Sequence, residues 1–315
     1  MIYVAAALIS FLLVFFAVPP LRRFALKVGF VDRPNKRKIH HQPIPLMGGA
    51  AIYGGCVIAL LVVNGITPLS LSVILGGGIL TIVGLCDDAW KAQGKDFPVW
   101  PRVILYLGAA SIPSLYNIMI TGITSPLNNQ YYIFSPWLAW LMTTIWIFAL
   151  INMLNFMDGI DGLASGVSIV SSLTLFIAAV IQGQLETAVL AIIAVGASVG
   201  FLLHNFYPAR IFMGDAGATF LGYLLAVIAV HGTSKRATAI SLLIPLLALG
   251  LPIADTLYVM TRRLLSGKAL HQADNMHTHH FLLRWGLTQV QAVSFLYLIA
   301  AIFALFSIIL LLVTG

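Results

Sequence analysis

Ten apolar runs, each about as long as the 20 residues needed to cross a bilayer as a helix, constrain the fold of this 315-residue chain more than any other feature. The chain is 60% hydrophobic and 9% charged, whereas a soluble domain has about 25% charged residues. No connection between the runs is long enough to fold alone. The sequence therefore predicts one all-α, polytopic membrane domain over residues 1–315 with about ten transmembrane helices, which start near Ile2, Met47, Leu69, Arg102, Pro136, Leu163, Glu186, Gly214, Thr238 and Thr288.

The positive charges lie in alternate connections and predict the topology. All of the 17 Lys and Arg residues except Lys235 and Arg236 fall in five of the connections, which are residues 21–46, 86–102, 156–162, 205–213 and 260–287. The positive-inside rule makes these connections cytoplasmic and puts both termini outside. A basic cytoplasmic rim also attracts anionic headgroups and phosphorylated ligands. We therefore interpret the net charge of +7 as a sign of membrane topology, and we expect no nucleic-acid partner.

The scarce carboxylates gather at the same face. Of the nine aspartates, eight fall in the cytoplasmic connections or within a turn of them: Asp32, Asp87, Asp88, Asp96, Asp158, Asp161, Asp215 and Asp274. The ninth, Asp255, lies about a turn before the cytoplasmic end of the ninth run. One loop aspartate is ordinarily solvated or caps a helix. Nine near one face of so apolar a chain indicate a functional site, because ionisable groups next to a membrane are costly.

The stretch NMLNFMDGIDGL, at the end of the fifth run, has polar side chains every three residues. If the helix continues to Asp158, then Asn152, Asn155, Asp158 and Asp161 form one polar stripe. Such a stripe must face protein or a water-filled cavity and not lipid. A hydrogen-bonded seam between helices is the structural alternative to a binding site.

Asp87 and Asp88 are adjacent at the end of the third run. Neighbouring helical residues point about 100° apart, so we expect one carboxylate to face a cavity and the other to support it. Lys91, Lys95 and Arg102 follow closely, and they either hold phosphate or only mark the cytoplasmic side.

Three further stretches carry polar groups to this face. Asp215 begins the eighth run beside Gly214 and Gly217, where it either caps the helix or takes part in phosphate and metal chemistry. Nearby Phe212 either stacks on a base or packs in the core.

The last cytoplasmic connection contains His277, His279 and His280, whose spacing does not suit a tetrahedral zinc site. Phosphate contact, pH sensing and a solvated loop are the readings that we keep for these histidines. The basic first connection, with the motif KIHHQPIPLMGG, either anchors the second run or folds over a substrate mouth.

A cytoplasmic-facing cleft lined by Asp, Asn, Lys and His favours Mg²⁺-dependent chemistry on a diphosphate. Mg²⁺ prefers oxygen ligands and usually completes its shell with substrate phosphates and water. The large apolar surface would allow the second reactant to be a lipid. An ion-coupled transporter is the alternative from another class, but it predicts carboxylates near mid-span. A catalytically silent scaffold is the third reading.

Six motifs in order, on the predicted cytoplasmic side, resemble the polyprenyl-phosphate N-acetylhexosamine-1-phosphate transferases. They are KIHHQPIPLMGG, DDAWK, NMLNFMDGIDGLASG, NFYPARIFMGDAGATFLG, DTLYVMTRR and HTHHFLLRWG, and they extend over nearly the whole chain. The resemblance implies transfer of a sugar 1-phosphate from a UDP-sugar to undecaprenyl or a related polyprenyl phosphate, with release of UMP. It implies Mg²⁺, with Mn²⁺ as an alternative, and a place in the bacterial inner membrane. A homodimer is compatible with it.

The resemblance also implies roles for individual residues. Asp87 matches the base or the carboxylate that orients phosphate, and Asp88 is its catalytic neighbour. Asp215 matches the principal Mg²⁺ ligand, with Asn155 as a second ligand or a diphosphate contact. The remaining matches are predicted to bind substrate: Asp158, Asp161, Asn205, Phe212, His277, His279, His280, Lys91, Arg102 and His40.

Within this family the spelling of the motifs indicates the donor. HTHH and KIHHQPIPLMGG resemble the branch that uses UDP-N-acetylglucosamine (UDP-GlcNAc), whereas UDP-MurNAc-pentapeptide or another UDP-HexNAc is the alternative donor. Two departures stand out: Ala216 and Ala218 replace common hydroxyl residues, and Leu46 replaces a frequent basic one. Neither removes a predicted ligand, so we expect activity in the initiating step of a lipid-linked cell-envelope glycan.

Overall fold

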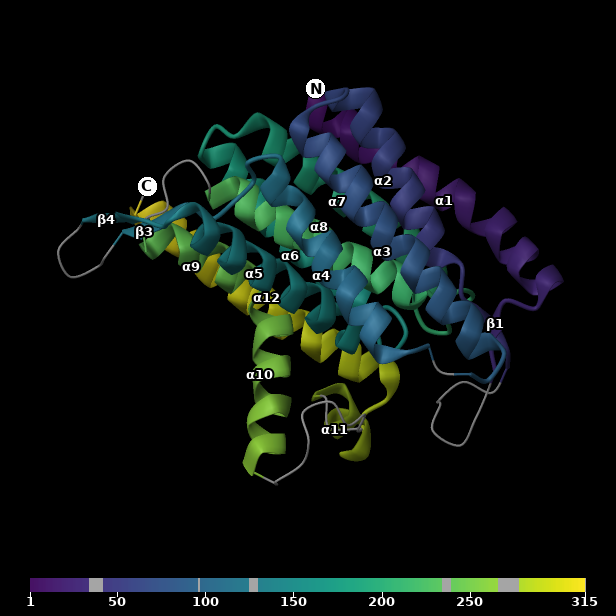
Figure 1. Cartoon of the computed structure of the whole chain (residues 1–315). Helices are drawn as coiled ribbons and strands as arrows, with labels where there is room; N and C mark the ends of the chain where they lie inside the picture. Colours follow the sequence, from purple (N-terminus) through teal and green to yellow (C-terminus); the bar gives the residue numbers. More distant parts are fainter. Residues whose placement is uncertain (34–41, 96, 125–129, 234–238, 266–277, 315) are drawn as a thin grey trace.

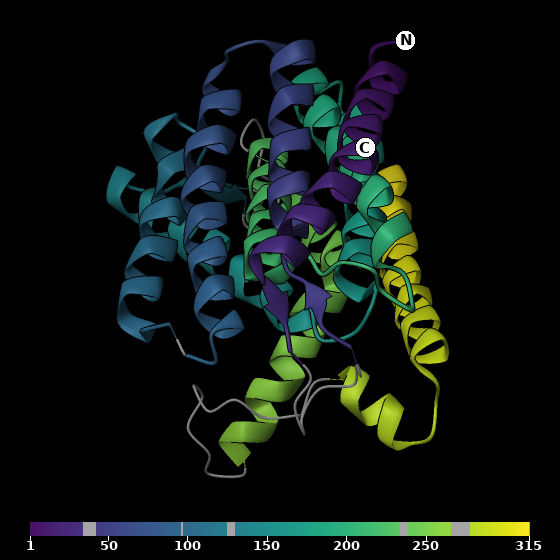
Figure 2. The ribbon, with the colours of Figure 1, turned by 90° about the vertical axis from the view of Figure 1, so that its right-hand side faces the viewer.

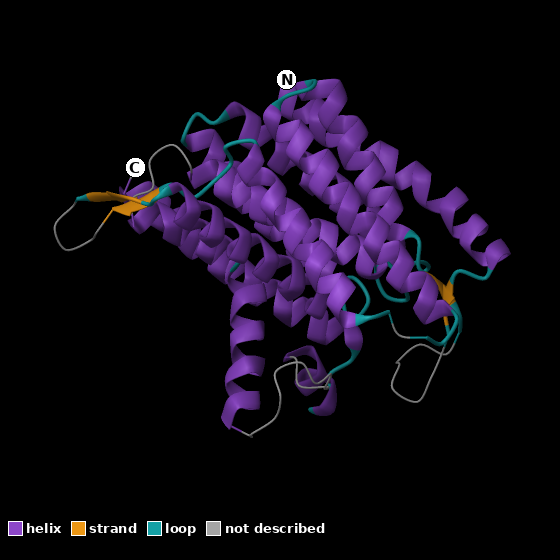
Figure 3. Cartoon of the chain, in the orientation of Figure 1, coloured by secondary structure: helices purple, strands orange, loops and turns teal. Residues whose placement is uncertain are grey.

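The chain folds into a bundle of helices with two short antiparallel sheets (Figures 1 and 3). This computed structural model describes all residues except 34–41, 96, 125–129, 234–238, 266–277 and 315. The sheets pair β1 (Val31–Asp32) with β2 (Ile44–Pro45) and β3 (Gly122–Thr124) with β4 (Tyr131–Ile133). The helices are α1 (Ile2–Val28), α2 (Gly48–Asn64), α3 (Pro68–Ala92), α4 (Val99–Leu115), α5 (Pro136–Met157), α6 (Leu163–Ile181), α7 (Leu185–Asn205), α8 (Gly214–Thr233), α9 (Ala239–Ala248), α10 (Gly250–Leu265), α11 (Thr278–Arg284) and α12 (Gln289–Thr314).

All ten predicted runs form helix, which confirms the all-α class. Within the described part of the chain, seven helices are long and apolar enough to cross a membrane: α1, α3, α5, α6, α7, α8 and α12. The bent pair of α9 and α10 would make an eighth crossing if it counts as one span. Helices α2 and α4 have 17 residues each and are shorter than a typical span. Ten crossings therefore stay a prediction.

The ninth run is not the continuous span that the sequence predicts. It breaks at Leu249, and its two parts meet at an angle of 77°. Pro252 has no N–H and so cannot donate to the carbonyl of Ala248, which interrupts the helical ladder. Gly250 lies against the ring of Phe303 in α12, since a Cβ there would come within 2.6 Å of that ring. Helix α10 consequently leaves the bundle and projects from it (Figure 1).

Helix α8 forms the centre of the bundle. It is 89% buried over its apolar window, whereas α1 is 22% buried and α12 is 28% buried. Gly84 of α3 touches the backbone of Ala216, and Gly222 of α8 lies against the backbone of α5. Tyr223 donates a hydrogen bond of 2.8 Å from its hydroxyl to the carbonyl of Ser72. Small residues thus bring α8 close to α3 and α5, as is usual where membrane helices pack tightly.

The two ends of the bundle differ. Both termini and the β3–β4 hairpin lie at one end, and α10, α11 and the β1–β2 sheet lie at the other (Figures 1 and 2). The first connection is tied to the α7–α8 connection at this second end, because the Phe212 N–H donates to the Pro45 carbonyl and the Gly48 N–H donates to the Phe212 carbonyl. Sequence segments far apart are therefore joined where the predicted polar motifs converge.

Candidate functional site

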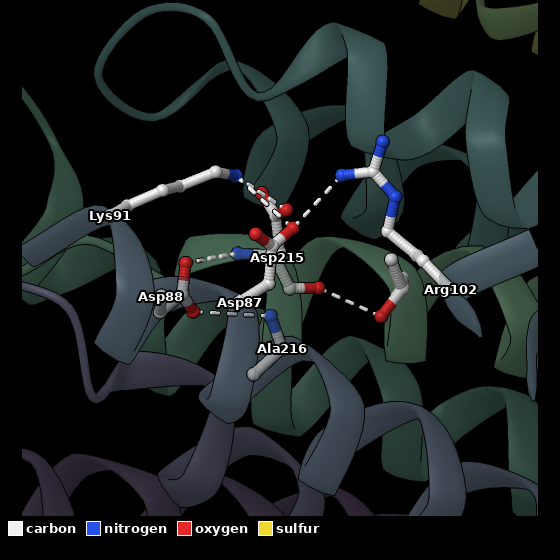
Figure 4. A network of polar contacts seen from close by, with 7 residues as sticks. Asp87, Asp88, Lys91, Arg102, Asp215 and Ala216 are labelled. Atoms are coloured by element: carbon white, nitrogen blue, oxygen red, sulfur yellow. Dashed lines mark hydrogen bonds and ion pairs between the residues drawn. The ribbon is translucent and has the colours of Figure 1, made fainter. Parts of the chain in front are cut away.

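Asp87 of α3 and Asp215 of α8 meet at a shared cation, the Lys91 ammonium (Figure 4). The Lys91 ammonium donates a hydrogen bond of 2.6 Å to Asp215 Oδ2 and lies 3.4 Å from Asp87 Oδ2. From α4, Arg102 donates a hydrogen bond of 3.0 Å from Nη1 to the same Asp87 oxygen. The side chain of Asn155, at the end of α5, also lies close to the Asp215 carboxylate. We call these five residues the Asp87–Asp215 site.

The Asp87–Asp215 site combines buried carboxylates with accessible cations. The side chain of Asp87 is 1% exposed and that of Asp215 is 18% exposed, whereas Lys91 is 40% exposed. Two carboxylates repel each other where water is scarce, and the ammonium and guanidinium offset this repulsion. The second oxygen of Asp87, Oδ1, is buried and has no hydrogen-bond partner among the residues that the structure describes. The site can therefore accept a further donor or a cation.

Asp88 has a different environment from its neighbour. Its side chain accepts hydrogen bonds from the Asp215 N–H at 3.1 Å and from the Ala216 N–H at 3.4 Å, so it caps the start of α8 (Figure 4). Gly214, with φ +67°, precedes these two donors, and any side chain there would meet the Asp88 carboxylate. Both Asp88 oxygens are thus used to hold the helix that carries Asp215. The catalytic role that the resemblance implies for Asp88 stays a prediction.

The predicted polar stripe is broken after α5. The helix ends at Met157, so Asp158 is its C-cap and Asp161 lies in the connection that follows, where Gly162 has φ +79°. Asn152 donates from Nδ2 to the carbonyl of Phe148 in its own helix at 2.7 Å. The structure therefore corrects the idea of one continuous helical stripe, because the helix stops before the two carboxylates.

Asp158 and Asp161 have separate surroundings in the α5–α6 connection. Burial, together with the nearby carboxylates of Asp215 and Asp161, raises the pKa of Asp158 to about 7, while Lys91 opposes this rise. Asp161 accepts a hydrogen bond of 2.9 Å from the Ala209 N–H, which ties the α5–α6 connection to the α7–α8 connection. Asp158 is thus electrostatically coupled to the Asp87–Asp215 site.

Asn205 joins three parts of the chain. Its Oδ1 accepts hydrogen bonds from the Gly162 N–H at 3.1 Å and from the Ser165 hydroxyl at 3.2 Å. Its Nδ2 donates to the Ile211 carbonyl at 3.0 Å, and the residue is 2% exposed. These contacts hold the α5–α6 connection, the start of α6 and the α7–α8 connection together. The substrate contact that the resemblance implies for Asn205 stays a prediction, as does that for half-buried Phe212.

Of the three histidines in the last predicted cytoplasmic connection, the two that the structure describes lie beside the α5–α6 connection. His279 is 2% exposed and packs against Gly159, while the ring of His280 lies 4.2 Å from the His279 ring between centroids. His277 and His40 lie outside the described residues. The histidine motif therefore lies in the same region as Asp158, because His279 contacts the residue that follows Asp158.

The chemistry of the Asp87–Asp215 site suits Mg²⁺. The Asp215 carboxylate, the nearby Asn155 amide and the unpartnered Asp87 Oδ1 are oxygen ligands of the kind that Mg²⁺ prefers. The Lys91 ammonium between the two carboxylates shows that they attract positive charge. Within the described ranges, no group of three His, Cys, Asp or Glu residues is arranged to hold a metal ion. A bound ion would therefore depend on substrate phosphates and water for the rest of its shell.

Two contacts at this end were not assigned from the sequence. The Tyr297 hydroxyl of α12 donates to the Gly162 carbonyl at 2.6 Å, and Asp255 of α10 accepts hydrogen bonds from Thr278 at the start of α11. Tyr297 lies inside an apolar run, so no local pattern indicated it. Asp255 was marked in the sequence by its position near the cytoplasmic end of its run and as the first residue of the motif DTLYVMTRR, but neither feature indicated which group it contacts.

The fold and the site define an all-α membrane protein with carboxylates and cations clustered at one end of its bundle. A sequence model of the family described as glycosyl transferase family 4 matches residues 70–233, which is more than half of the chain. The chain belongs to this family, and the family resemblance of its motifs is confirmed.

Relatives match over most of their length. A protein of Bacillus subtilis (strain 168), named a probable undecaprenyl-phosphate N-acetylglucosaminyl 1-phosphate transferase, is 33% identical over 98% of this chain and 84% of its own. The undecaprenyl-phosphate alpha-N-acetylglucosaminyl 1-phosphate transferase of Escherichia coli (strain K12) is 30% identical over 94% of this chain and 80% of its own. The decaprenyl-phosphate N-acetylglucosaminephosphotransferase of Mycolicibacterium smegmatis is 32% identical over 93% and 78%.

Proposed function

We propose that this protein transfers N-acetylglucosamine 1-phosphate from UDP-GlcNAc to undecaprenyl phosphate and releases UMP, as the first step of a lipid-linked cell-envelope glycan. The observation that carries the proposal is the Asp87–Asp215 site, where two carboxylates, two cations and an amide from four helices meet at one end of an apolar bundle. The names of the relatives support both the sugar and the class of lipid.

In this reaction an oxygen of the lipid phosphate attacks the phosphorus that carries the sugar. The bond from this phosphorus to the oxygen bridging to the uridylate breaks, and UMP leaves with that oxygen. Asp87, held by Arg102, takes the proton of the attacking phosphate or orients its oxygen. Lys91 and Arg102 offset the charge of the phosphates. Asp215 and Asn155 would hold Mg²⁺, or Mn²⁺ in its place, which when bound neutralises diphosphate charge and stabilises the leaving phosphate.

In this proposal the site lies on the cytoplasmic face of the bacterial inner membrane, and both termini lie on the other side. The Lys and Arg residues that the structure describes lie in or beside the connections at the end of the bundle with α10 and α11, as the positive-inside rule requires of a cytoplasmic end. The polyprenyl chain would lie along the apolar outer surface. Contacts of the histidine motif with the diphosphate or sugar, and a homodimer, belong to the same proposal.

The purified protein tests the proposal in a UMP-release assay. We expect release from UDP-GlcNAc with undecaprenyl phosphate, loss of release on chelation of Mg²⁺, and loss in Asp215→Ala. Glu186→Gln is the matched control, because Glu186 is an exposed carboxylate in the first turn of α7, at the opposite end of the bundle. No release from wild-type protein, or undiminished release from Asp215→Ala, would contradict the proposal.

A panel of donors separates the remaining alternative. Equal or greater turnover of UDP-MurNAc-pentapeptide or another UDP-HexNAc would change the donor and keep the chemistry. The transporter reading loses support because the described carboxylates of α3 and α8 lie at helix ends and not at mid-span. Counterflow of a substrate in proteoliposomes that contain the purified protein would support a transporter instead.

A further inference from the structure

Asp255 makes a second contact between separate helices that resembles the capping of α8 by Asp88. It lies in α10 and is 5% exposed. Its Oδ1 accepts hydrogen bonds from the Thr278 N–H at 2.8 Å and from the Thr278 hydroxyl at 2.5 Å. Thr278 is the first residue of α11, so Asp255 accepts one of the N–H groups that the helix itself leaves unpaired.

Helix α11 depends on such contacts. It has seven residues, and a helix this short is marginal in isolation because nucleation costs more than so few hydrogen bonds return. A second contact joins it to α10, where the Phe281 ring packs edge-on against Tyr258 at 6.0 Å between centroids. The guanidinium of Arg262 also lies 4.7 Å from the centre of that ring. Three positions spaced along α10 thus hold α11.

His279 follows Thr278 directly and is held with it. A Cβ on Gly159 would collide with the His279 imidazole, so the ring lies on the backbone of the α5–α6 connection between Asp158 and Asp161. Asp255, Thr278 and His279 enclose a gap with Met157 and Leu163 that has no room for a water molecule. In the intact protein, water therefore does not share the Thr278 donors with Asp255 at this gap.

We propose that Asp255 is a positioning residue, which fixes the start of α11 and thereby holds His279 on the α5–α6 connection next to the Asp87–Asp215 site. It acts as a hydrogen-bond acceptor for the Thr278 N–H and hydroxyl. The inference rests on the proposed function only in its consequence for turnover, since that consequence requires the histidine motif to contact the donor. The structural part of the proposal is independent of the reaction.

If Asp255 acts as a hydrogen-bond acceptor, two substitutions at this position should have different effects. Asp255→Asn keeps an oxygen that accepts from both Thr278 donors, whereas Asp255→Ala removes it. A general base or a metal ligand would be lost in both variants. Thr278→Ser keeps both donors, and Thr278→Val removes the hydroxyl but keeps the N–H.

Hydrogen exchange followed by mass spectrometry on the detergent-solubilised full chain tests the positioning. In Asp255→Ala we expect residues 278–284 to exchange about tenfold faster, which is the scale of losing one helix cap. Asp255→Asn and Thr278→Ser should exchange as the wild type does, and α8 should be unchanged in all variants. Should Asp255→Ala not fold, Thr278→Val gives the same comparison with a smaller increase.

Steady-state kinetics with UDP-GlcNAc then test the consequence for turnover. We expect kcat/KM to fall about tenfold in Asp255→Ala and to be retained in Asp255→Asn. Unchanged exchange of residues 278–284 in Asp255→Ala would overturn the proposal, as would an Asp255→Asn variant that loses turnover while α11 keeps its protection. If residues 278–284 exchange faster in Asp255→Ala but the wild-type protein releases no UMP, the positioning role is upheld and the proposed function is refuted.

Discussion

Replacing Asp88 separates the support of α8 from the chemistry of Asp87. In Asp88→Ala the N–H groups of Asp215 and Ala216 lose their only acceptor that the described structure shows, at a place where Asp88 itself is 1% exposed. In Asp88→Asn one oxygen remains, so one of the two hydrogen bonds is kept. We therefore expect Asp88→Ala to be worse than Asp88→Asn in stability.

The size of the effect follows from the two contacts. A buried N–H without a partner costs about 1–3 kcal/mol, so two would cost about 2–6 kcal/mol. Removing the Asp88 carboxylate also removes its desolvation cost and its repulsion from the nearby Asp215 carboxylate, which offsets part of this loss. We expect about 2 kcal/mol for Asp88→Ala, near the upper limit for removal of an N-cap. Asp88→Asn should cost about half as much.

Thermal unfolding in detergent, monitored beside UMP release, measures both effects. A loss of about 2 kcal/mol lowers the apparent Tm by about 5 °C for a chain of this size. Asp87→Asn is the matched comparison, because it leaves the α8 cap in place; it should lower UMP release strongly with a smaller change in Tm. An Asp88→Ala variant with wild-type Tm and no UMP release would refute the reasoning and assign Asp88 to the chemistry itself.

Two other changes test the packing and the electrostatics of the site. Gly84→Ala places a methyl group against the Ala216 backbone, so α3 and α8 must separate; we expect a loss of UMP release and a lower Tm, whereas Gly54→Ala in α2 meets nothing within 4 Å and should leave both unchanged. Asp158 has a pKa raised from 3.8 to about 7. The folded protein then binds more protons than the unfolded chain between those values, so the contribution of Asp158 to stability falls as the pH rises through this window. Asp158→Asn should make Tm depend less on pH there, and equal pH profiles would contradict the assignment.

The helices and the gathering of charged groups at one end of the bundle were predictable from the sequence because both depend on local composition. In lipid, every backbone N–H and carbonyl must be paired within the chain, so an apolar run of about 20 residues forms a helix wherever it packs. The break at Leu249 escaped this rule, because hydropathy measures the apolar character of a run and does not register a missing donor at Pro252. The shorter helices α2 and α4 also show that an apolar run does not by itself determine how many times the chain crosses.

The motifs identified the residues of the candidate site but could not say which of them meet. Asp87 and Asp215 are 128 positions apart in the sequence and are brought together by Lys91, which pairs with both. The spacing of three in NMLNFMDGIDGL suggested one helical stripe, yet the helix ends at Met157 and places Asp161 in the following connection. The spacing of polar residues shows which of them would share a helix face, but it does not predict the residue at which the helix ends.

By itself, the sequence determined an apolar, all-helical membrane chain with its charged groups at alternate connections, because transfer of side chains and backbone between water and lipid depends on each segment separately. Only the tertiary structure decided that Asp88 caps α8, that Asp255 caps α11 and that His279 lies on Gly159. These contacts pair a side chain with a backbone group from a distant helix. At Gly214 and Gly159 the missing side chain leaves room for Asp88 and His279, and no local pattern encodes which residue fills that room.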